Sequence, residues 1–241
     1  MKSSVILPAV VFGAFAIFTT AVAIFQLIDA EIPSAVVALG GTAFCLGFVI
    51  PAFTIGPGRV APRIESAVEG TTFRPDRGVE IPMQAAMAGA LVSSTLILIL
   101  LPAGRLAIPV PPNMRYALPF AAAIAVVCIA PMLWRNIKRG SASYLRLTER
   151  GFEFVQGWHP RGAEWASVQD VAADAPNQKA ATPGAIVFIL GDGTALSFTA
   201  TAYTPGGDAL RELVRYYWSH PESRDELSDD RSRTRLMATL R

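Results

Sequence analysis

The sequence predicts an α-helical transmembrane bundle of four helices, followed by a small β-rich domain that a C-terminal amphipathic helix closes. Four long uncharged apolar stretches, a later switch to alternating apolar and polar residues, and a return to helical periodicity predict this class. The chain of 241 residues is 52% hydrophobic and only 17% charged. An average soluble domain carries roughly 25% charged residues, so the composition also favours a membrane protein.

The apolar stretches are each long enough to cross the hydrocarbon core, which takes about 20 helical residues. They are Val5–Ile28, Ile32–Ile55, Met83–Leu101 and Tyr116–Trp134. The first follows Lys2 and has small residues near Ala23, which together are typical of a cleavable signal peptide. We favour an uncleaved helix, because the apolar run continues to Ile28.

Basic residues flank these stretches unequally. Arginines occur in the loop 56–82, and Arg135, Lys138 and Arg139 follow the fourth stretch, whereas the loop after the first stretch carries only acids. The positive-inside rule therefore predicts a cytoplasmic N-terminus, a cytoplasmic loop 56–82 and a cytoplasmic C-terminal domain. Abundant alanine and a preference for arginine over lysine are typical of high-GC bacterial genomes. We therefore expect a multi-pass protein of the bacterial inner membrane.

Small residues recur on one face of the second and third stretches, where they would let helix backbones approach closely. The candidate packing residues are Gly40, Ala43, Gly47, Ala85, Gly89 and Ser93. We expect packing within the bundle, with a homodimer face as the alternative.

The pattern changes to period two from Tyr144. Turn signals occur at 148–151, 159–162 and 191–193, and Ala185–Leu190 is a continuous apolar strand. Leu210, Leu213, Val214 and Tyr217 then have helical spacing, and the helix is expected to start near Thr204. We therefore predict a transmembrane domain at 1–140 and a cytoplasmic β-rich domain at 141–221. A polar tail at 222–241 is expected to be a short helix or disordered.

The order of these elements resembles the bacterial PH-like domain. The segment YLRLTERGFEF, Trp165 and the helix LRELVRYYWSHP carry the resemblance over Ser141–Pro221, about a third of the chain. Four-helix proteins that end in such a domain resemble a group of actinobacterial membrane proteins of unassigned role. The resemblance implies a binding or assembly module and no enzymatic activity, so it assigns no catalytic residue.

The residue pattern itself predicts no catalytic, cofactor-binding or metal site. The two cysteines lie in apolar stretches, and each of the two histidines stands apart from other metal-ligand residues. The net charge of +2 gives no reason to expect a nucleic-acid partner. The membrane stretches hold hydroxyls but no charged residue, which makes a transporter subunit the least favoured function.

The expected partners are membrane lipids and a protein at or in the membrane, for which the domain acts as a scaffold or regulator. The alternative is a sensor of anionic lipid. Candidate lipid contacts are Arg135, Lys138, Arg139, Arg150 and Arg161. The acids Glu149 and Glu153 dilute the charge around Arg150, so the three residues after the fourth stretch are the better candidates.

Overall fold

The computed structural model describes residues 3–107, 110–111, 114–174 and 183–240. The chain divides into two units. The helical unit comprises Met1–Gly56 and Gly78–Gly140, and the β unit comprises Pro57–Arg77 and Ser141–Arg241. Each unit is therefore built from two separate segments of the chain.

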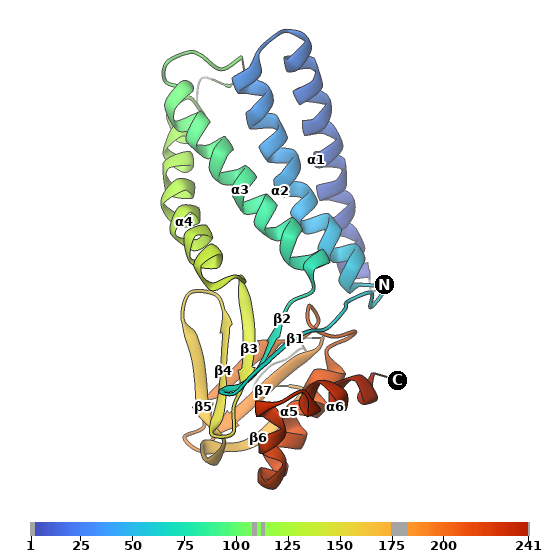
Figure 1. Ribbon diagram of the computed structural model, residues 1–241. Helices are drawn as coiled ribbons and strands as arrows, with labels where there is room; N and C mark the ends of the chain where they lie inside the picture. Colours follow the sequence, from blue (N-terminus) through green and yellow to red (C-terminus); the bar gives the residue numbers. More distant parts are fainter. Residues whose placement is uncertain (1–2, 108–109, 112–113, 175–182, 241) are drawn as a thin grey trace. The chain divides into compact units, whose positions relative to one another are not determined.

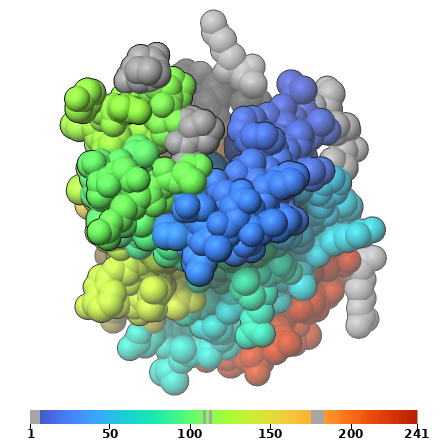
Figure 2. Space-filling view, turned by 90° about the horizontal axis from the view of Figure 1, so that it is seen from above, coloured from blue at the N-terminus to red at the C-terminus, as the bar shows by residue number. Residues whose placement is uncertain are grey.

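The helical unit confirms the four predicted membrane helices. They are α1 (Ser3–Ile28), α2 (Ile32–Ile55), α3 (Arg77–Leu100) and α4 (Ala117–Arg139), and they lie side by side (Figure 1). Figure 2 views the same helices from above. At about 1.5 Å per residue, a helix of 23 residues is roughly 35 Å long and exceeds the hydrocarbon core of about 30 Å. The chain is thus built as a multi-pass membrane protein.

The predicted loop 56–82 is not simply a loop. It contains the hairpin β1 (Arg63–Ala67) and β2 (Gly70–Arg74), and α3 begins at Arg77 instead of Met83. Apolar and polar residues alternate over only five residues in each strand. The arginines that indicated a cytoplasmic loop also made this alternation hard to recognise in the sequence. Pro82 is the sixth residue of α3, so the helix continues through it with one backbone hydrogen bond fewer.

Sheet A joins this hairpin to the strands that follow α4. Its antiparallel order is β1-β2-β3-β4-β5, with β3 at Ser143–Leu147, β4 at Gly151–Gln156 and β5 at Pro160–Glu164. The pairing of β2 with β3 places Thr72 opposite Arg146, although 73 residues that include α3 and α4 separate them. When the helices span a bilayer, the α2–α3 segment and the C-terminal segment must therefore share one side of it.

Sheet B is a three-stranded antiparallel sheet with the order β6-β7-β8. Its strands are β6 (Val168–Ala172), β7 (Ala185–Leu190) and β8 (Ala195–Thr199). The predicted turn at 191–193 is confirmed, with Gly193 at φ +83°. The turn predicted at 159–162 is wrong, because β5 begins at Pro160 and the chain reverses at Gly157–His159. Gly157, at φ +114°, permits this earlier turn.

The core of the β unit lies between the inner faces of the two sheets and α5 (Asp208–Ser219). The Phe152 and Phe188 rings stack with centroids 3.7 Å apart, and the buried Trp165 indole donates to the Thr148 carbonyl at 2.9 Å. The predicted face of α5 is confirmed, since Leu210, Leu213, Val214 and Tyr217 are all buried. The helix starts at Asp208, later than Thr204, because Gly206 and Gly207 both adopt left-handed backbone.

The C-terminal tail is part of the β unit. It forms the 3₁₀ helix η3 (Pro221–Ser228) and α6 (Arg231–Thr239), and it buries Leu227 and Leu236 completely. Thr71 of β2 donates to the Leu227 carbonyl at 2.7 Å and hydrogen-bonds the Ser232 hydroxyl at 2.8 Å. The predicted boundaries 141–221 therefore omit both the hairpin and the tail that packs against it.

Candidate functional site

The five candidate lipid contacts fall in different units. Arg135, Lys138 and Arg139 occupy the last two turns of α4, whereas Arg150 and Arg161 belong to the β unit. The described secondary structure does not place all five in one unit.

The C-terminal end of α4 has the composition of a membrane–water boundary. Lys138 Nζ lies 4.9 Å from the centroid of the Trp134 ring, and the Trp134 side chain is exposed. Tyr116, which is also exposed, lies just before the other end of α4. It precedes Trp134 by 18 residues, which corresponds to about 27 Å of helix. Aromatic residues favour both interfaces of a bilayer whose core is about 30 Å thick. This spacing favours a position for Lys138 at the level of the lipid headgroups.

Arg150 and Arg161 border one hollow of about 480 Å³ in the β unit. We call it the arginine hollow. Its lining includes Arg146, Arg150, Arg161, Glu153, Glu164 and Gly162. The structure therefore brings together the two predicted arginines and adds Arg146.

Charges of both signs surround the arginine hollow. Strand pairing sets Arg146 opposite Glu153, and Glu153 also accepts a hydrogen bond from the Tyr144 hydroxyl. Arg146 Nη2 is 2.6 Å from Glu69 Oε2 on the β1–β2 turn. Arg161 pairs with buried Phe154, so strand alternation directs its side chain to the opposite face from Gly162. The three arginines thus do not converge as a cluster dedicated to one anion.

Two glycines let β4 and β5 approach each other beside the hollow. A Cβ added to Gly151 would come within 3.0 Å of the Ala163 carbonyl oxygen. A Cβ added to Gly162 would come equally close to the Phe152 carbonyl oxygen. Gly162 also places no side chain above the sheet, which leaves the hollow open on the side of the edge strand.

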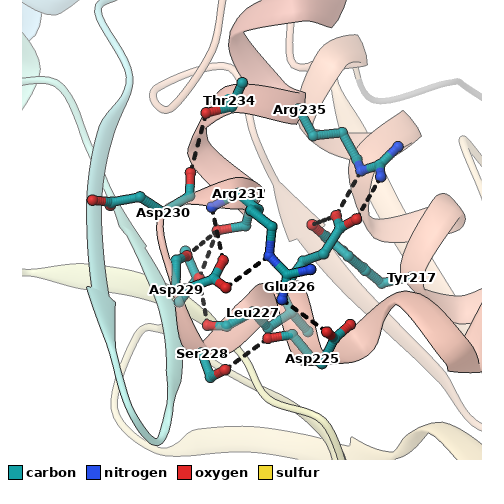
Figure 3. Close-up of polar contacts among 12 residues, drawn as sticks. Tyr217, Asp225, Glu226, Leu227, Ser228, Asp229, Asp230, Arg231, Thr234 and Arg235 are labelled. Carbon is teal, nitrogen blue, oxygen red and sulfur yellow. Dashed lines mark hydrogen bonds and ion pairs between the residues drawn. The ribbon is translucent and has the colours of Figure 1, made fainter.

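A polar cluster that the sequence did not indicate fastens the tail to α5 (Figure 3). Arg235 donates to both carboxylate oxygens of Glu226, at 2.8 and 2.7 Å, and the Tyr217 hydroxyl donates to the same carboxylate at 3.1 Å. The Arg235 guanidinium also lies 3.9 Å from the centroid of the Tyr216 ring. These contacts are nine residues or more apart and have no helical spacing, so no local pattern could have predicted them.

The cluster predicts a pH-dependent stability. Hydrogen bonds from Arg235 hold the pKa of Glu226 below its ordinary value, against the opposing effect of burial. The carboxylate therefore stabilises the fold above its unfolded pKa of about 4.3, and this contribution is lost as pH falls through the lower folded pKa. We expect Glu226→Gln to be less stable than the wild type at neutral pH, with the difference shrinking below pH about 4.3. Urea unfolding of both proteins from neutral pH to below pH about 4.3 measures the difference in their free energies of unfolding. A difference that stays constant with pH would contradict the prediction.

The predicted packing residues mark the contact between α2 and α3, with one correction. A Cβ added to Gly40 would come within 3.0 Å of Ser93 Oγ and of the Gly89 carbonyl oxygen, and one on Gly89 would meet Ala43. The Ser93 hydroxyl donates to the Val37 carbonyl at 3.1 Å. Opposite Gly47 stands Ala86, which is buried, whereas the predicted Ala85 is exposed. This face of small residues therefore packs against another helix of the same chain, as the packing interpretation expects.

No described residues form a group of three or more His, Cys, Asp or Glu side chains that suits a metal ion. His220 is engaged with its own helix, where Nδ1 lies 3.1 Å from the Tyr216 carbonyl oxygen and the ring stacks on Tyr216. No protein-family model, curated protein or solved structure matches this chain. The candidate site therefore rests on the geometry of the arginine hollow and of the end of α4.

Proposed function

We propose that this chain is a bacterial inner-membrane protein with a cytoplasmic PH-like domain, which serves as a binding or assembly module for a protein partner at the membrane. Two antiparallel sheets that enclose a core with α5 support the PH-like assignment. The basic residues at the end of α4 and in the α2–α3 segment support the cytoplasmic orientation. No catalytic role is assigned to any residue.

The observation that carries the proposal is the mixed charge of the arginine hollow, whose lining runs along sheet A from Arg150 after β3 to Arg161 in β5. The turn between β3 and β4 adjoins the β1–β2 turn, because Thr71 pairs with Leu147. The chain connections to the membrane helices leave sheet A from the other end, at Arg63, Arg74 and Ser143. Strands of five residues separate the two ends by about 17 Å.

The mixed charge of the arginine hollow suits a polypeptide better than a lipid headgroup. A surface with charges of both signs selects a protein partner whose opposite charges occupy the matching positions. A polyanionic headgroup would face Glu153 and Glu164 as well as the arginines. Lipid contact is better supplied by Lys138 and its neighbours on α4, where each basic residue near an anionic leaflet contributes about 1 kcal/mol.

Site-specific photo-crosslinking in cells tests this function. A photoreactive amino acid at Arg150 in the full-length protein is expected to give a discrete protein adduct. The matched control is Arg215, an exposed arginine on α5, which should give none. Adduct formation at both positions or at neither would contradict a partner site at the hollow. Crosslinking of Arg150 to anionic lipid alone would favour the lipid sensor instead.

A further inference from the structure

Trp158 is an exposed aromatic residue at the tip of the β4–β5 hairpin. Its relative exposure is 51%, and it lies between Gly157 and His159 in the turn. The base of the turn is fixed, because the Gln156 side-chain amide donates to the Thr199 carbonyl at 2.8 Å and accepts from the Thr199 N–H at 3.0 Å. The hairpin therefore presents its indole on a supported turn.

Strand register places this tip at the end of sheet A from which the membrane connections leave. Ser143, the first residue of β3, pairs with Gln156, the last residue of β4. Since β2 is antiparallel to β3, its last residue, Arg74, belongs to the same end. The β1–β2 turn with Val68 belongs to the opposite end.

Short connections join this end of sheet A to α3 and α4. The chain passes from Arg139 at the end of α4 to Ser143 in four residue steps, which span at most about 14 Å. From Arg74 to Arg77 at the start of α3 there are three steps, at most about 11 Å. Both helix termini belong at the bilayer surface, and exposed Trp134 marks that level on α4.

We propose that the β4–β5 turn is a second membrane contact, in which Trp158 enters the lipid–water interface on the side where α4 ends. The indole combines apolar area with one N–H donor, which suits the headgroup region. Arg161, exposed just beyond the turn, adds attraction to anionic lipid. The contact rests on the four helices spanning the bilayer; Trp158 is not among the lining residues of the arginine hollow, whereas Arg161 is.

This contact gives a predicted lipid-contact residue a different role. Arg161, which also borders the arginine hollow, acts in lipid binding from the β4–β5 hairpin. Arg150, at the other end of sheet A, is left for the protein partner. The β unit is then held at the membrane by its chain connections and also by the contact of Trp158 with lipid.

Depth-dependent quenching of a fluorophore tests the proposal on the full-length protein. Cysteines at Trp158 or Val68, in a background without Cys45 and Cys128, carry an environment-sensitive dye in phosphatidylethanolamine–phosphatidylglycerol nanodiscs. Val68 is the matched control, because it is 91% exposed on a hairpin tip at the opposite end of sheet A. We expect blue-shifted emission and quenching by nitroxide-labelled lipid at position 158, and quenching by aqueous iodide at position 68.

A dye at His159→Cys, which keeps Trp158 in place, should behave like the dye at 158. This second variant keeps the test valid if loss of the indole weakens the contact. Equal iodide quenching at positions 68 and 159, with no effect of nitroxide lipid at either, would overturn the proposal. Crosslinking from Arg150 is unaffected by that outcome, so the two proposals fail separately.

Discussion

Replacing Leu227 by alanine is expected to lower the free energy of unfolding of the β unit by about 2–5 kcal/mol, the usual range for a buried leucine. Leu227 is fully buried in the core, and its carbonyl accepts the hydrogen bond from Thr71 of β2. Removal of the side chain leaves a cavity where the tail meets the hairpin. Urea unfolding of the full-length protein in detergent, followed by tryptophan fluorescence, measures the change.

Val68→Ala is the matched control for this substitution, because Val68 is an apolar side chain that is 91% exposed. Its effect should stay within about 0.5 kcal/mol, as for most surface positions. Equal stabilities of Leu227→Ala and Val68→Ala would mean that the tail does not pack as described.

Gly40→Val is expected to disrupt the contact between α2 and α3. The new Cβ would meet both Ser93 Oγ and the Gly89 carbonyl oxygen at less than 3.0 Å, and a backbone oxygen cannot move aside as a flexible side chain would. Overpacking of this kind typically costs about 1–3 kcal/mol, and a rigid helix pair leaves little room to relax. The measurement is the thermal unfolding of the purified protein in detergent, followed by circular dichroism and size-exclusion chromatography.

Gly13→Val on α1 provides the control with the same change in helix propensity. A Cβ at Gly13 has no atom within 4 Å. We expect a melting temperature close to that of the wild type for Gly13→Val and a clearly lower one for Gly40→Val. An equal decrease in melting temperature in both variants would mean that helix propensity, and not packing between α2 and α3, causes the effect.

Long apolar runs and clear periodicity made the helices and the face of α5 predictable. Leu210, Leu213 and Tyr217 recur over several turns, so each position reinforces the others. The β1–β2 hairpin has only five residues per strand and pairs with β3 across two membrane helices. Its stability comes from that distant pairing, which no local pattern reveals.

The candidate site was predictable in part. The turn at 148–151 located Arg150, and register then joined it to Arg146 and Glu153. Leu227 was not recognisable as a core residue, because charged residues surround it in sequence. The error at Ala85 has a simple geometric cause, since two turns of about 3.6 residues back from Ser93 end nearer to Ala86.

The central claim is that the segment between α2 and α3 and the segment after α4 form one sheet. Cysteines at Thr72 and Arg146 test it in native membranes, because these residues are directly paired between β2 and β3. Antiparallel partners lie about 4.5–5.5 Å apart at Cα, within the range that a disulfide bridges. Thr72→Cys with Gln169→Cys, which lies on sheet B, is the control. The account predicts a disulfide-linked peptide by mass spectrometry for the first pair alone, and absence of that link in the folded protein would contradict it.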